Sequence, residues 1–202
     1  MDADFLIIGG GIAGVSAQTT VPRLEISALK NAFEKYQESA IKDRRFTHAD
    51  LQPLIQKHSV QFEVTPLGKS VLGKSISSLD WGSGQTKVML WSQMHGNEST
   101  ATMALFDLFN FLEGKSDQYD SFRQLLNSQL HLKFIPMLNP DGADVFKRRN
   151  ALDIDLNRDA ISLISPEAVV LKKARDDFEP EFGFNLHDQQ IYYNVVNTPK
   201  QA

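Results

Sequence analysis

Hydrophobic residues recur along the chain at two spacings, one typical of helices and one typical of strands. A repeat of about 3.6 residues predicts an amphipathic helix over residues 24–37, carried by Ile26, Leu29, Phe33 and Tyr36. The segment Lys87–Trp91 is short and continuously apolar, as expected of a strand buried on both faces. Apolar and polar residues alternate in three further predicted strands, at residues 60–64, 130–134 and 182–186.

Two further helices follow from apolar residues at helical spacing, at Ala101–Leu112 and around 119–126. A last helix is expected to begin at Ser165, where a capping residue precedes a proline and an acid. Residues 71–79 predict a strand with a turn at Gly73 and Lys74, whereas the mixed, charged residues 38–58 predict no element. Strands alternating with helices indicate an α/β fold, with a mixed, largely parallel sheet and helices on both faces.

Composition narrows the range of functions. The chain has 202 residues, 21 Lys+Arg against 25 Asp+Glu and a net charge of −4, so it lacks the strongly basic character typical of nucleic-acid binding. No apolar run approaches the roughly 18 residues of a membrane span. Because the chain has 0 Cys, disulfides, thiolate-ligated metals and thiol catalysis are excluded. A metal site in this chain has to use histidine and carboxylate ligands.

The N-terminal residues carry a different signal. Gly9, Gly11 and Gly14 follow an apolar run, which predicts a strand, a turn and a helix start and resembles FAD-dependent oxidoreductases of the Rossmann type. The βαβ unit is not completed, because Thr19–Pro22 interrupts the expected helix. We therefore interpret residues 1–21 as a Rossmann-like remnant and residues 22–202 as a separate domain. Flavin or nicotinamide binding stays open as an alternative, and the absence of a basic signal-peptide start favours a cytoplasmic location by default.

Three groups of polar residues follow predicted strands, where ligands bind in open α/β sheets. His95 and Glu98 lie between an apolar strand and the core helix, and His187 closes the last strand. Two histidines and one glutamate match the ligand set of catalytic zinc sites, which leave one coordination position open. Zinc lowers the pKa of a water molecule in that position to about 7, which makes the water a nucleophile near neutral pH. These residues therefore predict a hydrolytic centre with one Zn²⁺ ion.

An arginine-rich segment lies between these ligands in the sequence. Arg148, Arg149 and Arg158 fall close together, near Asn157, and guanidinium groups suit the bidentate recognition of a carboxylate. A zinc site beside a carboxylate-binding group indicates hydrolysis next to a free C-terminus. The predicted partner is thus the C-terminus of a peptide or protein, with no nucleic acid or membrane.

Three segments together resemble the zinc carboxypeptidase family, the carboxypeptidase A-like enzymes, from about residue 22 onward: WSQMHGNESTATMALFDLFNFL, NPDGADVFKRRNALDIDLNRD and FNLHDQ. The resemblance implies that His95, Glu98 and His187 hold zinc and that Arg148 polarises the scissile carbonyl, with Arg149 as the less favoured alternative. It further implies that Asn157 and Arg158 bind the terminal carboxylate. We expect Asp155 and Asp159 to orient or neutralise the arginines and Asp188 to lie beside a zinc ligand.

The same resemblance implies that some functional residues lie outside these 202 residues. In the family, the general-base glutamate, the specificity pocket and a capping tyrosine come well after the third zinc ligand, whereas the sequence ends at Ala202. We therefore expect a partial carboxypeptidase domain, incomplete at its C-terminus, with impaired turnover. The alternative is a non-catalytic zinc module that binds peptide C-termini. The sequence leaves side-chain specificity and oligomeric state open.

Overall fold

The computed structural model describes residues 4–8, 11–15 and 25–188 of the chain. The strands are β1 (Asp4–Ile8), β2 (Gly11–Val15), β3 (Glu63–Lys69), β4 (Ser75–Trp81), β5 (Thr86–Trp91), β6 (Leu130–Ile135) and β7 (Phe182–Asn185). The α-helices are α1 (Ile26–Tyr36), α2 (His48–His58), α3 (Thr100–Glu113), α4 (Asp120–Gln129), α5 (Pro140–Asp144) and α6 (Pro166–Phe178). A short 3-10 helix, η1, spans Leu156–Arg158.

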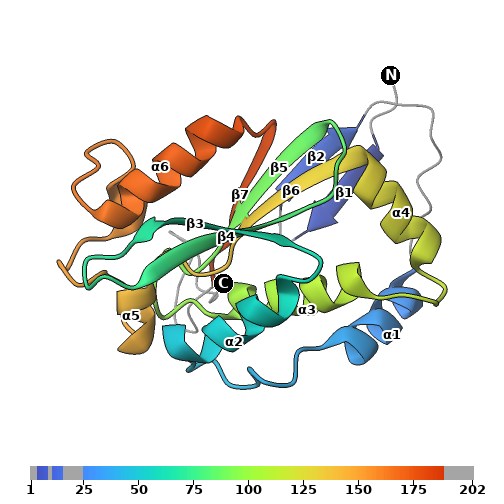
Figure 1. Ribbon diagram of the computed structural model, residues 1–202, viewed down its shortest axis with the longest axis horizontal. Coiled ribbons are helices and arrows are strands. Elements are labelled where there is room, and N and C mark those ends of the chain that lie inside the picture. Colours follow the sequence, from blue (N-terminus) through green and yellow to red (C-terminus); the bar gives the residue numbers. More distant parts are fainter. Residues whose placement is uncertain (1–3, 9–10, 16–24, 189–202) are drawn as a thin grey trace, which may run out of the picture.

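The central sheet has the strand order β3-β4-β6-β5-β7 and confirms the predicted mixed topology (Figure 1). β3, β4 and β6 pair antiparallel, whereas β5 pairs parallel with both β6 and β7. The parallel pairs follow from the intervening helices, because a crossover connection is needed to return the chain in the same direction. The carboxyl ends of β5, β6 and β7 therefore meet at one edge of the sheet.

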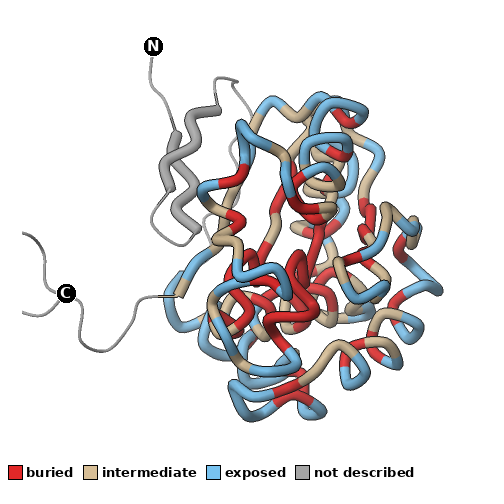
Figure 2. Tube along the Cα trace, turned by 90° about the vertical axis from the view of Figure 1, so that its left-hand side faces the viewer, coloured by how far each residue is buried: buried red, intermediate tan, exposed pale blue. Residues whose placement is uncertain are grey.

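Helices cover both faces of this sheet, as predicted (Figure 1). Leu90 and Phe134 point to the face covered by α2 and α3, where they join a core rich in phenylalanine. Their neighbours Met89 and Ile135 point to the opposite face and pack in the cluster that includes Ala174 and Phe178 of α6. Adjacent residues of one strand serve two cores, which explains why β5 is apolar at successive positions. Figure 2 shows the buried residues gathered along these interior surfaces.

The N-terminal prediction of a helix after the glycine turn is wrong. Gly11–Val15 is a strand that pairs antiparallel with Asp4–Ile8, and the two form a sheet of their own. Gly9 lies outside the described residues. Within residues 4–8 and 11–15 the chain thus forms a hairpin instead of the strand–turn–helix that receives a pyrophosphate in dinucleotide-binding folds. The division into residues 1–21 and 22–202 stays a prediction.

The helix α2 lies within residues 38–58, for which the sequence predicted no element. It begins at a capping box, in which the Thr47 side chain accepts from the Asp50 backbone and the Asp50 side chain accepts from the Thr47 backbone. Leu51 and Leu54 are buried against the phenylalanine core. α2 thus supplies part of the core.

Several predicted boundaries shift by a few residues. The strand expected at residues 60–64 begins at Glu63, and Val60 is 86% exposed. The strand expected from residue 71 begins at Ser75, after a turn in which Gly73 has a φ of +82°. In the described parts of the chain, no helix is long and apolar enough to cross a membrane.

Candidate metal centre

The loop between β5 and α3 carries two of the predicted zinc ligands. His95 and Glu98 are separated by a tight turn in which the Glu98 backbone N–H donates to the His95 carbonyl at 3.0 Å. Gly96 brings this turn against the rest of the protein, because its backbone N–H donates to the Arg148 carbonyl at 3.3 Å. The Gln93 side chain donates to the Gly96 carbonyl at 2.9 Å. The turn is therefore held from both sides.

The third predicted ligand reaches the same place from β7. Trp91 of β5 pairs with Asn185 of β7, so the two parallel strands end side by side. His187 follows two residues after this pair, beside the loop that carries His95 and Glu98. Residues 89 positions apart in the sequence thus meet at the carboxyl edge of the sheet.

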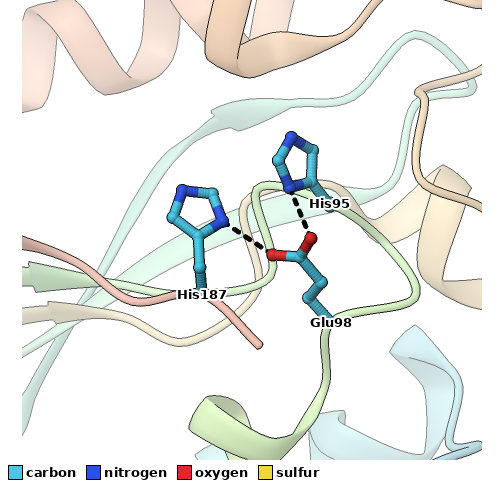
Figure 3. Close-up of side chains that lie close together, drawn as sticks. All are labelled: His95, Glu98 and His187. Atoms are coloured by element: carbon cyan, nitrogen blue, oxygen red, sulfur yellow. Dashed lines mark hydrogen bonds and ion pairs between the residues drawn. The ribbon is translucent and has the colours of Figure 1, made fainter. Parts of the chain in front are cut away.

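The three side chains converge (Figure 3). Nδ1 of His187 is 2.6 Å from one Glu98 carboxylate oxygen, and Nδ1 of His95 is 2.9 Å from the other. One ligand atom from each residue lies within 4.8 Å of the other two. His95 is 1% exposed, and its Nδ1 faces the Glu98 carboxylate at 2.9 Å. A buried imidazole nitrogen beside a carboxylate fits a cation ligand.

The charge state of Glu98 suits this arrangement. Burial by itself would raise the pKa of this carboxyl, but hydrogen bonding from His187 and the close contact with His95 outweigh it and lower the pKa to about 2. Glu98 is 4% exposed, so a full negative charge is held in a nearly buried site. Such a charge needs cationic partners, which the two histidines or a metal ion can supply.

Asp155 and Arg148 form the next layer around the ligands. Nε2 of His95 is 2.9 Å from the Asp155 carboxylate, which also accepts from Nε of Arg148 at 3.1 Å. The predicted role of Asp155 in orienting an arginine is therefore confirmed for Arg148. Burial opposes the ionised form of Asp155, but the His95 contact and the charge of Arg148 lower its pKa overall. A histidine fixed through its second nitrogen by a carboxylate is a recurring feature of metal sites.

The structure brings Arg148 to the site and leaves Arg149 away from it. Nη1 of Arg148 donates to the Glu98 carboxylate at 3.0 Å, and its side chain is 37% exposed. Arg149 instead donates to the Asp153 carbonyl at 2.8 Å. The geometry therefore favours Arg148 as the arginine beside the ligands.

Asn157 and Arg158 lie in η1, close to the end of β7. Oδ1 of Asn157 accepts a weak, 3.5 Å hydrogen bond from Asn185, two residues before His187. Arg158 is exposed, and no ion pair of its guanidinium is found within residues 25–188. Asp159 was expected to neutralise an arginine, and this is wrong: its carboxylate accepts from the Ser165 hydroxyl and the Ser165 backbone N–H. The turn at η1 directs Asp159 away from the arginines.

Sequence reasoning missed Arg44, which reaches the site from the segment before α2. Nη2 of Arg44 donates to the Asp188 carboxylate at 2.7 Å, and Asp188 also accepts from Thr100. Asp188 thus contacts the start of α3 rather than the imidazole of its neighbour His187. These four residues line a cavity of about 310 Å³ next to the candidate ligands. No periodicity or motif marks Arg44.

The other three histidines lie away from the converging side chains and contact other parts of the fold. His48 contacts the Ser75 carbonyl at 2.9 Å. His58 is fully buried between aromatic rings, 3.0 Å from Glu113. His131 packs against Phe178 with ring centroids 4.9 Å apart.

The comparisons with known proteins identify the family. Residues 47–190 match the family described as zinc carboxypeptidase. The chain is 40% identical over 68 residues to carboxypeptidase SOL1 of Arabidopsis thaliana, covering 33% of this chain and 13% of the relative. It is 28% identical over 119 residues to carboxypeptidase 2 of Trichophyton tonsurans, covering 58% of this chain and 21% of the relative. The chain therefore spans only a minor part of these curated relatives.

A solved structure is similar as well. The metallo-carboxypeptidase from Burkholderia cenocepacia superposes with a TM-score of 0.62 at 27% identity, covering 70% of this chain and 40% of that chain. Carboxypeptidase A from Helicoverpa armigera shares the fold, with a TM-score of 0.59 at 16% identity over 82% of this chain and 54% of its own. The family match covers more than half of the sequence and includes all three converging side chains. The chain belongs to the zinc carboxypeptidase family.

Proposed function

We propose that this chain binds one zinc ion through His95, Glu98 and His187 and acts in the hydrolysis of the C-terminal peptide bond of peptides or proteins. The observation that carries the proposal is the convergence of these three side chains within 4.8 Å at the carboxyl edge of the sheet. The buried Nδ1 of His95, which faces the ionised carboxylate of Glu98 at 2.9 Å, supports a cation there. When bound, zinc supplies a Lewis acid that polarises a carbonyl and lowers the pKa of water.

The surrounding cations support a peptide substrate. We infer that Arg148 donates to the oxygen that develops negative charge at the scissile carbonyl, because its guanidinium already lies 3.0 Å from Glu98 beside the ligands. Arg158 is exposed and without an ion-pair partner in residues 25–188, so its guanidinium is available for a carboxylate. Asn157, in the same turn, would add an amide donor to that carboxylate.

The state of the carboxylates favours slow hydrolysis. It is also consistent with the alternative function, a non-catalytic zinc module that binds peptide C-termini. Glu98, Asp155 and Asp188 are the carboxylates that meet the described site, and each is already held by a histidine or an arginine. Because these three carboxylates are engaged in this way, none of them is free to accept a proton from an attacking water. A general base typically contributes about 10²- to 10⁴-fold to the rate of hydrolysis. We therefore expect the chain to bind peptide C-termini but to hydrolyse them slowly.

The test combines metal analysis with a matched pair of peptides. The unsubstituted chain should hold one zinc ion per molecule, and His95→Ala or His187→Ala should lose it. A peptide with a free C-terminus should bind, whereas the amidated peptide, which lacks the carboxylate, should not. Arg158→Ala should abolish the difference between the two peptides, and Arg149→Ala, an arginine that points away from the site, is the control.

The outcomes separate the candidate functions. Release of C-terminal amino acids that depends on zinc and on Arg148 supports the carboxypeptidase. Binding that requires the free carboxylate, with no release, supports the non-catalytic module. A chain that binds no zinc, or binds it equally well after both histidine substitutions, overturns the proposal.

A further inference from the structure

Asp188 makes a cluster of contacts that joins two parts of the candidate metal centre. Its Oδ2 accepts from the Thr100 backbone N–H at 3.1 Å and from the Thr100 hydroxyl at 2.8 Å. The same oxygen accepts from Nη2 of Arg44 at 2.7 Å. The Asp188 side chain is 7% exposed, whereas the Arg44 side chain is 48% exposed, so the cluster lies at the surface with its carboxylate largely covered.

The contact with Thr100 caps a helix from a distant part of the chain. Thr100 is the first residue of α3, and the N-cap residue Ser99 makes no capping hydrogen bond with its own side chain. A carboxylate at a helix N-terminus satisfies a free backbone N–H and interacts favourably with the helix dipole. Asp188, the residue after His187, is therefore attached to Thr100, the first residue of the helix that follows Glu98.

Arg44 completes the attachment from a third segment. Besides Asp188, its guanidinium contacts the carbonyl of Asn97, the residue before Glu98, at 3.4 Å. The Ser99 hydroxyl donates to the Arg44 carbonyl at 2.6 Å, and Ser99 is fully buried. Arg44 thus bridges the segments on which Glu98 and His187 are carried.

Without these contacts, the distance between His187 and Glu98 would be weakly fixed by the local chain. His187 lies two residues beyond the end of β7, and the backbone N–H of Leu186, the residue before it, donates the final hydrogen bond to β5 at the Trp91 carbonyl, at 2.9 Å. The side chain of His187 is 32% exposed, whereas His95 is nearly fully buried and held by Asp155. His187 is therefore the candidate ligand whose position depends most on contacts of its neighbours.

We propose that Asp188 and Arg44 are positioning residues that fix His187 at ligand distance from Glu98 and thereby set the affinity and geometry of the metal centre. This inference rests on the proposed zinc site. Neither residue contacts a ligand side chain through its own functional group, so both act through the backbone and through Thr100. Ligand geometry has to be held within about 0.5 Å for a site to function well, and several hydrogen bonds that converge on one carboxylate can hold it.

The experiment measures zinc affinity by competition with a chelator in the full chain of 202 residues. Asp188→Asn keeps the shape of the side chain but removes its charge, and Arg44→Gln removes the cation from a half-exposed position that tolerates substitution. We expect zinc affinity to fall at least tenfold in each, with Arg44→Lys recovering part of the loss. Asp177→Asn, an exposed aspartate on α6 paired with Lys173, is the matched control and should leave affinity unchanged.

A second readout separates positioning from simple destabilisation. The visible absorption of the cobalt-substituted protein reports ligand geometry, and it should change in Asp188→Asn and Arg44→Gln at saturating metal but not in Asp177→Asn. Unchanged affinity and spectrum in both variants overturn the inference while leaving the zinc site standing. Lower unfolding stability with unchanged affinity of the folded fraction also overturns it. Failure of the unsubstituted chain to bind zinc overturns both the inference and the proposed function.

Discussion

Replacing Gly96 by alanine should damage the metal centre although no ligand is changed. Gly96 lies between His95 and Glu98, and a Cβ added there would lie 2.0 Å from the carbonyl carbon of Gly142 and 2.3 Å from the backbone N of Ala143. Both atoms belong to the backbone of α5, so neither can rotate away. Separation to the 3.4 Å of an ordinary contact requires the ligand loop or α5 to move as a unit.

The magnitude follows from two consequences of that movement. Overpacking of a dense interior costs about 1–3 kcal/mol, so the free energy of unfolding of the metal-free protein should fall by that amount. The displacement also exceeds the roughly 0.2 Å tolerance of ligand distances in metal sites, and it moves His95 and Glu98 together. We therefore expect zinc affinity to fall at least tenfold, which is about 1.4 kcal/mol of binding free energy.

Urea denaturation and chelator competition measure the two effects on the same preparation. Gly183→Ala is the matched control, because a Cβ there would meet only the Trp91 ring at 3.4 Å, an ordinary contact. It should leave both quantities nearly unchanged. If Gly96→Ala keeps the stability and the zinc affinity of the unsubstituted chain, the ligand loop is not packed on α5 and the reasoning fails. If stability falls and affinity does not, α5 gives way to the added methyl group and the ligand loop stays in place.

Three further substitutions test the network around the site. Asp155→Asn should lower zinc affinity about 10- to 100-fold, measured by chelator competition, because it weakens the contact with His95 Nε2. The pKa of Glu98 is about 2 in the folded protein against an ordinary value of 4.5. Its contribution to the free energy of unfolding is therefore present above about pH 4.5 and is lost as the pH falls toward about 2. The metal-free protein should lose about 2 kcal/mol more between about pH 5 and 3 than Glu98→Gln, measured by urea denaturation. Asp141→Asn should destabilise the fold by a few kcal/mol in thermal unfolding, because buried Asp141 holds Ser70 and Lys74.

The parallel half of the sheet and the convergence of the ligands could be predicted from the sequence for one reason. Strands buried on both faces are continuously apolar, and their carboxyl ends in a parallel sheet lie at a common edge. His95 follows such a strand, and His187 follows a second strand, which alternates apolar and polar residues. The pairing of Trp91 with Asn185 then brings their loops together without any information from distant contacts.

The helices α1 and α2 show where hydrophobic periodicity stops being informative. In α1 the period of Ile26, Leu29 and Phe33 correctly predicts a helix, yet these side chains are 73%, 50% and 54% exposed. The residue of this helix that is buried is Ala32. In α2 a proline and a buried histidine interrupt the apolar pattern, and the capping box and tertiary packing determine the helix instead. Periodicity therefore indicates a helix more reliably than it indicates which face is buried.

The acidic residues around the ligands differ in role because of backbone geometry, which short sequence spacing does not encode. Asp155 and Asp159 flank the same arginine-containing turn, and from the sequence we expected one role for both. The 3-10 helix between them directs Asp155 to His95 and Arg148 and directs Asp159 to the Ser165 backbone. Asp188 follows a candidate ligand but contacts the start of α3 instead of that ligand. Its partner Arg44 comes from a segment 144 residues earlier, so only the tertiary fold could identify the pair.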